Sequence, residues 1–133
     1  MKVREDFVTN SSSASYIICF ARIADKEKAQ KIIDKHELDE ENIYDAAGVK
    51  GRMHWGTLGA DWAGATIWGA DDILAKHPDD NFVIVTGYND ADYDEDYEPV
   101  YNYDFDEDEI IADITEENGF ADIEVATGEG RDG

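Results

Sequence analysis

The longest alternating run of apolar residues lies near the start of the chain, over residues 15–23 (SYIICFARI). On an extended backbone, one face of this run would carry Tyr16, Ile18 and Phe20. The other face would carry Ile17, Cys19, Ala21 and Ile23. Because both faces are apolar, the pattern predicts a central strand that is covered on both sides.

Three further stretches have strand patterns. Residues 81–88 (NFVIVTGY) are apolar on both faces, like the first stretch. Residues 100–105 place three aromatic side chains on one side, Tyr101, Tyr103 and Phe105. Residues 121–127 alternate, so Ile123 and Val125 are predicted to point inward and Asp122 and Glu124 outward.

Four segments between these strands are predicted as helices. The first begins at an Asp25 N-cap and runs to about His36, with an inner stripe of Ala29, Ile32, Ile33 and His36. The second spans residues 39–47 and is closed by Gly48. The third begins at Asp71 or Asp72 and ends before Pro78. The fourth spans residues 106–117, with an acidic first turn and an inner face of Ile110, Ile111 and Ile114.

The order of these elements indicates an α+β fold, a mixed β-sheet with helices, in a single acidic domain over residues 1–133. One assignment is a ferredoxin-like βαββαβ unit with an inserted helical segment at about residues 38–80. Other mixed sheets stay open, because that unit would leave residues 81–88 on a sheet edge although both faces of this strand are apolar. Residues 1–14 are predicted as an N-terminal arm and residues 128–133 as a flexible tail.

Charge distinguishes this chain from an ordinary small domain. It holds 33 acidic and 11 basic residues, a net charge of −22. Residues 1–77 carry 13 acids and 10 bases, whereas residues 78–133 carry 20 acids and Arg131 alone as a base. Direct binding to nucleic acid or to an anionic membrane is therefore not expected, since both are polyanions. Basic proteins and cations are the expected partners.

The compartment follows from what the sequence lacks. Cys19 is the only cysteine, so neither an internal disulfide nor a Cys-based zinc site is expected. Residues 1–10 do not have the apolar run of a signal peptide, and no segment approaches the length of a membrane span. We therefore expect a cytoplasmic protein that makes no membrane contact.

The acidic segment at residues 89–109 is the main functional signal, with 11 acids, no base and five aromatic residues. If it is extended, acids at alternate positions share one face with a spacing of roughly 6.6–6.8 Å. Such a row could imitate a phosphate backbone toward a basic groove, with aromatics as anchors; the alternative is a solvated acidic loop. The predicted partner-binding residues are Asp90, Asp92, Asp94, Glu95, Asp96, Tyr97, Glu98, Tyr101, Asp104, Asp106, Glu107, Asp108 and Glu109.

The same segment could bind a divalent cation through its carboxylates. An EF-hand is not expected, however, because a loop counted from Asp90 has Glu95 at the glycine position and Tyr101 at the final glutamate position. No specific metal site is predicted.

A tryptophan- and glycine-rich stretch at residues 54–69 is the remaining candidate. Trp55, Trp62 and Trp68 could line a pocket, but packing of this stretch over a sheet face is the favoured interpretation. Its glycine spacing matches no phosphate-binding loop. The three histidines, at 36, 54 and 77, form no metalloprotease or paired-ligand motif. Neither catalytic residues nor a cofactor are assigned, and the apolar neighbours of Cys19 predict an inert core thiol.

Residues 6–17 (DFVTNSSSASYI) carry one resemblance. This stretch resembles the opening of small uncharacterised phage and bacterial proteins, which runs FV(S/T)NSSSSSF. Here Ala14 interrupts the serine run and Tyr16 replaces phenylalanine. The resemblance covers about a dozen residues, brings no assigned activity and implies a phage or mobile-element setting.

Together these observations favour a non-enzymatic acidic binding or inhibitor protein. One form would be a phage anti-defence protein that mimics nucleic acid and occupies the basic groove of a nucleic-acid-binding host protein. The alternatives are a divalent-cation-binding or general interaction module and, third, an enzyme with a pocket lined by the tryptophan and glycine stretch. The oligomeric state does not follow from the sequence.

Overall fold

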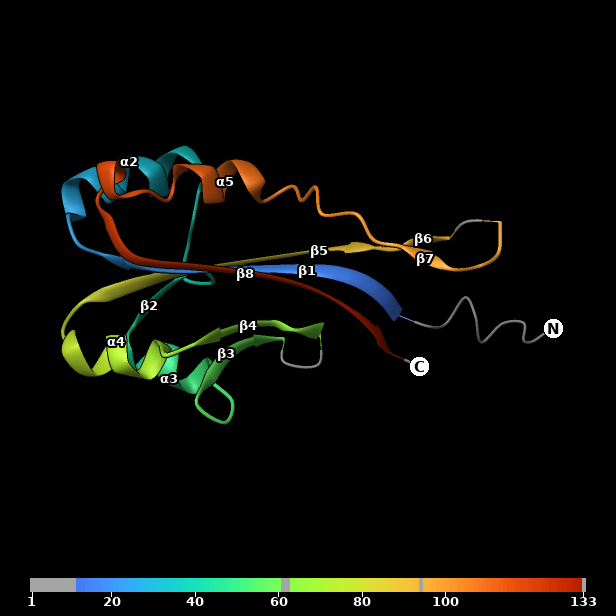
Figure 1. Cartoon of the computed structure of the whole chain (residues 1–133). Coiled ribbons are helices and arrows are strands. Elements are labelled where there is room, and N and C mark those ends of the chain that lie inside the picture. The colour runs from blue at the N-terminus through green and yellow to red at the C-terminus, as the bar shows by residue number, and fades with distance from the viewer. Residues whose placement is uncertain (1–11, 61–62, 94, 133) are drawn as a thin grey trace.

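The computed structural model describes residues 12–60, 63–93 and 95–132 and contains helices packed on an antiparallel sheet (Figure 1). The sheet has four strands in the order β2 (Ile43–Asp45), β5 (Asn81–Asp90), β1 (Ser12–Ile23) and β8 (Phe120–Asp132). Each neighbouring pair is antiparallel. The prediction of an α+β fold is confirmed, and so is the central position of β1.

One face of the sheet is covered by two helices, α2 (Lys26–Lys35) and α5 (Asp108–Asp113), together with the short 3₁₀ helix η2 (Glu116–Asn118) (Figure 1). The buried cluster on this face combines Cys19, Ala21 and Val85 of the sheet with Ile32 of α2 and Ile114 after α5. Cys19 and Ala21 lie on the same face of β1, as its alternation predicts.

The opposite face is covered by the segment between β2 and β5. It contains α3 (Ala46–Arg52), the hairpin of β3 (Thr57–Ala60) and β4 (Ala65–Trp68), and α4 (Ala70–Lys76) (Figure 1). Phe20 and Phe82 stack here at a centroid distance of 5.5 Å. Burying one such side chain stabilises the fold by about 1.5–3 kcal/mol. Packing over the sheet is the role that the sequence favours for the tryptophan and glycine stretch.

Helix α2 has the predicted start and stripe. The Asp25 carboxylate accepts hydrogen bonds from the N–H groups of Glu27 and Lys28, at 3.1 and 3.2 Å, and so caps the first turn. Ala29 and Ile32 are buried against the sheet.

The helix predicted over residues 39–47 is wrong. The Asp39 side chain accepts a hydrogen bond from the Glu41 N–H at 2.9 Å and sets a turn, after which Ile43 and Tyr44 extend as β2. Asp45 then acts as an N-cap, accepting from the Gly48 N–H at 2.7 Å, and α3 begins at Ala46. Gly48 therefore lies inside a helix instead of ending one.

The last helix is shorter than the predicted range of 106–117. It ends at Asp113, where the Asn118 side-chain amide donates to the Asp113 carbonyl at 2.8 Å. The chain then turns so that Ile114 is buried, as predicted, and Ile110 and Ile111 pack at the margin of the same cluster.

The strand predicted over residues 100–105 is also wrong. Only Pro99–Val100 (β7) is extended, and it pairs with Asp92–Tyr93 (β6) instead of joining the sheet. Beyond it, side chains bind the backbone: Ser15 donates to the Asn102 carbonyl, and the Asp104 N–H donates to the Asn102 side chain at 2.9 Å. These two bonds occupy the Asn102 carbonyl and the Asp104 N–H, groups that a strand ladder would need.

Both chain ends depart from the predicted arm and tail. Strand β8 continues to Asp132, and its last residues pair with the start of β1 in a register that places Ser12 opposite Asp132. Residues 12–14 and 128–132 therefore belong to the sheet, because each end supplies the other's hydrogen bonds. Residues 1–11 and 133 lie outside the described part of the chain. Val125, predicted to point inward, is 50% exposed.

The connectivity places β1 and β2 parallel to each other with the antiparallel strand β5 between them. In the ferredoxin-like assignment, residues 81–88 are the second strand of the βαββαβ unit in chain order. In the structure β2 is the second strand, and the inserted segment, residues 46–80, follows it. The ferredoxin-like assignment stays a prediction. Within the described ranges, no helix is both long and apolar enough to cross a bilayer.

Candidate functional site

The acidic segment does not form the predicted straight row. Strand β5 ends at Asp90, and the chain then reverses in the β6–β7 hairpin, where Asp92 lies opposite Val100 and Tyr93 opposite Pro99. Asp96 lies in the turn, so Asp90, Asp92, Asp96 and Glu98 do not share one extended face. Asp94 falls outside the described residues. The regular spacing that would imitate phosphates is therefore wrong, because a turn and not a strand follows Tyr93.

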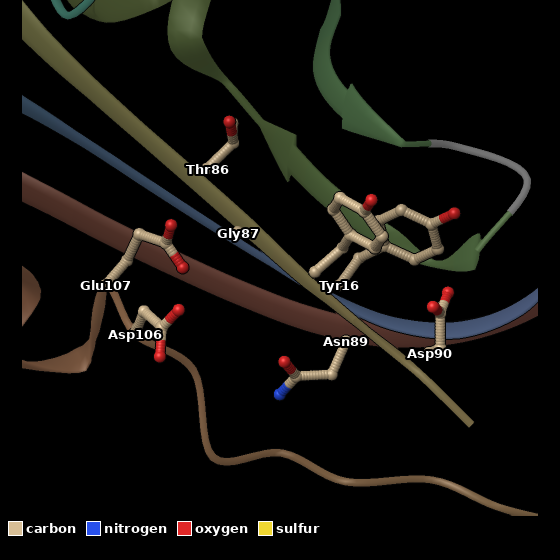
Figure 2. Close-up of a pocket in the computed structure, with 8 residues that line it drawn as sticks. Tyr16, Thr86, Gly87, Asn89, Asp90, Asp106 and Glu107 are labelled. Atoms are coloured by element: carbon tan, nitrogen blue, oxygen red, sulfur yellow. The ribbon is translucent and has the colours of Figure 1, made fainter. Parts of the chain in front are cut away.

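The fold instead brings the start and the end of the acidic segment together. A groove of about 650 Å³ lies between the last half of β5 and the chain that enters α5, and Figure 2 shows the residues that line it. Of the predicted residues it gathers Asp90, Asp106 and Glu107. The other lining residues are Tyr16, Thr86, Gly87, Tyr88 and Asn89, which the sequence does not single out.

The groove has an aromatic side and a carboxylate side. Tyr16 and Tyr88 stack with ring centroids 6.2 Å apart, and Tyr88 is 64% exposed. Asp106 and Glu107 lie across the strand from Tyr16 (Figure 2). Glu107 can lie over the strand because Gly87 has no side chain: a Cβ there would be 2.2 Å from the Glu107 Oε1.

The groove carboxylates have no cationic partner in the described part of the chain, since none of those residues forms an ion pair with Asp90, Asp106 or Glu107. Carboxylates accept strong, charge-assisted hydrogen bonds from cationic groups.

The other predicted binding residues fall outside this groove. Tyr97 is 75% exposed and Tyr101 partly buried near the β6–β7 hairpin, where Glu95 and Glu98 are exposed. The Asp108 carboxylate accepts from the Phe105 N–H at 2.9 Å and so serves the start of α5. Asp104 and Glu109 are exposed.

The Tyr103 side chain is bound to strand β8. Its hydroxyl donates to the Glu129 carboxylate at 2.6 Å. This hydrogen bond, with partial burial and the nearby negative charge, raises the pKa of Tyr103 to about 12. The contact joins the segment before α5 to β8.

The two described tryptophans are exposed. Trp55 is 87% and Trp68 74% exposed, and Trp62 lies outside the described residues. A cavity of about 280 Å³ does lie between the hairpin and the sheet, but its walls include Leu58, Ala60 and Ala65 and neither described tryptophan. The interpretation of an enzyme with a tryptophan-lined pocket gains no support from this geometry.

Two charged clusters that the sequence did not reveal lie at the opposite end of the sheet. The Arg22 guanidinium binds Asp122 at 2.8 Å and Asp80 at 3.0 Å. Its pKa is raised, first by the hydrogen bond to Asp122. His77 lies 3.4 Å from Asp80 and 3.8 Å from Asp122. Arg22 lies in β1, Asp122 in β8, and His77 and Asp80 in the loop between α4 and β5. Only the contact between His77 and Asp80 is local in the sequence, so no local motif indicates the whole cluster.

The second cluster joins α2 to α5. Asp113 contacts the Lys35 Nζ at 2.8 Å and the His36 Nε2 at 2.7 Å. The hydrogen bonds from Lys35 and then His36 lower the pKa of the Asp113 carboxyl. The first cluster joins two strands of the sheet to the loop before β5, and the second joins two covering helices, so both have a structural role.

Cys19 has no exposed surface, and its burial raises the pKa of the thiol to about 12. It is therefore protonated at neutral pH and cannot act as a thiolate nucleophile in this state. In residues 12–60, 63–93 and 95–132, no three His, Cys, Asp or Glu side chains are grouped to hold a metal ion.

No family model, curated protein or solved structure matches the chain. The candidate site is an open acidic groove with aromatic residues, and it lies along one strand of an antiparallel sheet.

Proposed function

We propose that this chain is a non-enzymatic acidic protein that binds a basic protein partner stoichiometrically in the cytoplasm. The observation that carries the proposal is the groove beside β5. Asp90, Asp106 and Glu107 converge there beside the stacked Tyr16 and Tyr88, without cations among the described residues. Carboxylates can steer a basic partner toward the groove, and aromatic side chains can anchor it there.

The charge of the whole chain supports this proposal. A net charge of −22 repels nucleic acid and anionic membranes and accelerates association with basic surfaces. The N-terminal resemblance supports a phage or mobile-element setting. In that setting the partner would be a host nucleic-acid-binding protein, and occupying its basic groove would inhibit it. Because the carboxylates do not form a regular row, the proposal of a nucleic-acid mimic rests on the net charge and the groove and not on phosphate-like spacing.

The test compares two variants with the same change in charge. The groove variant carries Asp90→Asn, Asp106→Asn and Glu107→Gln. The control variant carries Gln in place of Glu40, Glu41 and Glu116, three exposed acids outside the groove. Each protein is immobilised, exposed to a bacterial lysate at moderate salt, and then used for association kinetics with the captured proteins.

We expect the wild type and the control variant to retain the same basic proteins, and the groove variant to lose them. Association should slow and its salt dependence should become shallower in the groove variant, since local steering charges have been removed. Equal loss in both variants would mean that only net charge matters. Equal retention in both would show that the groove is a solvated surface, and the proposal would fail.

A further inference from the structure

The outer edge of β5 changes character along its length. On its inner side β5 pairs with β1 from Phe82, opposite Arg22, to Asp90, opposite Ala14. On its outer side β2 covers only Asn81, Phe82 and Val83. The Ile84 N–H then donates to the Asn42 carbonyl at 2.8 Å, and the Asn42 side chain donates to the Ile84 carbonyl at 3.1 Å. Within the described ranges, no strand pairs with this edge beyond Ile84.

The direction of the free backbone groups follows from these bonds. Backbone N–H and C=O groups alternate between the two edges of a strand. Because those of Ile84 point outward to Asn42, those of Thr86, Tyr88 and Asp90 point outward as well. The Ala91 N–H, one residue further, points inward and donates to the Ser13 carbonyl at 2.8 Å, as this alternation requires. The outward-facing backbone groups of Thr86, Tyr88 and Asp90 therefore have no strand partner among the described residues.

The groove lies along this edge, since Thr86, Gly87, Tyr88, Asn89 and Asp90 all line it. We propose that the free edge of β5 at residues 86–90 binds an extended, basic segment of the partner, which adds to the sheet as a further strand. The proposal rests on the proposed function and specifies how the groove recognises its partner. Strand addition supplies affinity through the backbone, and side chains at alternate positions supply specificity.

The two walls of the groove indicate which side chains the segment carries. Residues of an added strand alternate between the two faces of the sheet. On the hairpin face they would meet the rings of Tyr16 and Tyr88 and the Asp90 carboxylate, where a lysine or arginine can lie over an aromatic ring. On the other face they would meet Asp106 and Glu107. Both faces therefore favour basic side chains.

The same charges exclude the other common occupant of a free edge, a second copy of the chain. Two copies pairing through β5 would bring together two sets of the same carboxylates on chains that each carry a net charge of −22. Charged side chains beside an edge strand are a known protection against self-association. The groove thus repels its own copies and attracts a basic strand.

The probe is a blocked synthetic peptide of repeating Lys-Lys-Thr-Thr, long enough to span residues 84–91, which places lysines on both faces of an extended strand. Its matched control is the same peptide with every second backbone amide N-methylated, which keeps the charge and removes donors from one edge. Affinity is measured by calorimetry at physiological salt with the full chain. Hydrogen exchange of the Thr86, Tyr88 and Asp90 amides is followed with and without each peptide.

We expect the unmethylated peptide to bind and the methylated peptide to bind at least about tenfold more weakly, because two or more backbone hydrogen bonds are lost. Exchange at Thr86 and Tyr88 should slow only with the unmethylated peptide. The groove variant should weaken binding of both peptides, and the control variant should not.

Other results would overturn strand addition. Equal binding of the two peptides with no protection of the amides would leave charge-based recognition of a basic partner intact but exclude the added strand. Failure of both peptides, while captured proteins still distinguish the groove variant from its control, would have the same meaning. A dimer by sedimentation whose edge amides are already protected would identify a second copy as the occupant.

Discussion

The two halves of β5 show how one strand can serve both the core and the surface. Its first half contains Phe82, Val83, Ile84 and Val85, all buried, with helices or a hairpin over both faces and β2 along the edge. Its second half, residues 86–90, has an outer edge that no described strand covers, and it borders an open acidic groove. The change takes place at Ile84, where Asn42 provides the last outer hydrogen bonds.

The charges follow the same division. At the covered end, Arg22, Lys35 and His36 each lie against a carboxylate of another element. At the open end, Asp90, Asp106 and Glu107 have no such counterion among the described residues. A region whose charges are satisfied internally supports the fold, whereas a region whose charges are left open can bind another molecule. This difference is the basis for the proposal that residues 86–90 bind a partner.

The largest expected effect tests the covered half. Phe82→Ala removes a fully buried ring that stacks on Phe20, and it should lower the free energy of unfolding by about 3–5 kcal/mol. Tyr88→Ala changes an aromatic residue on the same face of the same strand in the open half, where the ring is 64% exposed. This variant should lose about 1 kcal/mol or less. Urea unfolding followed by tryptophan fluorescence measures both.

Similar losses in the two variants would contradict the division of β5, since they would mean that Tyr88 is part of the core. Tyr88→Ala should in addition weaken binding of the lysine–threonine peptide, which provides a second reading of the same substitution.

An intermediate effect is expected from the ion cluster at the covered end. Arg22→Gln removes the cation between Asp80 and Asp122 and leaves two carboxylates near each other. Because both carboxylates are partly exposed, the loss should be moderate, about 1–2 kcal/mol. Lys50→Gln removes one positive charge from an exposed position on α3 and should change stability by less than about 0.5 kcal/mol. Equal losses would mean that net charge, not the cluster, accounts for the effect.

The covered half is also the half that sequence reasoning predicted well. The apolar alternation of β1 and of residues 82–85 correctly indicated buried strands, and the carboxylate of Asp25 correctly indicated the start of α2. These signals are local, because burial on both faces requires a continuous apolar run and a cap requires only its own helix.

The open half was predicted poorly for physical reasons that are equally specific. Acidic residues at alternate positions suggested an extended row, but alternation of polar residues does not determine whether the chain continues or turns after Tyr93. The stack of Tyr16 on Tyr88 and the approach of Glu107 to Gly87 depend on strand register and on a distant loop. The free edge depends on how far β2 extends, and β2 itself was taken for part of a helix.

The smallest expected effect concerns Asp113, which holds α5 to α2 over the covered face. Hydrogen bonds from Lys35 and His36 hold the pKa of its carboxyl below the ordinary value of 3.8. A carboxyl whose pKa is lower in the folded state stabilises the fold above its unfolded pKa, and this stabilisation is lost as the pH falls through the folded pKa. Asp113→Asn should therefore be less stable than the wild type at neutral pH, and the difference should shrink as the solution is acidified below pH 3.8. Urea unfolding at a series of pH values measures this difference, with Glu117→Gln, an exposed acid of η2, as the variant expected to show no comparable trend. A difference between wild type and Asp113→Asn that stays constant down to the acid transition would show that the bonds to Lys35 and His36 do not stabilise the helix pair.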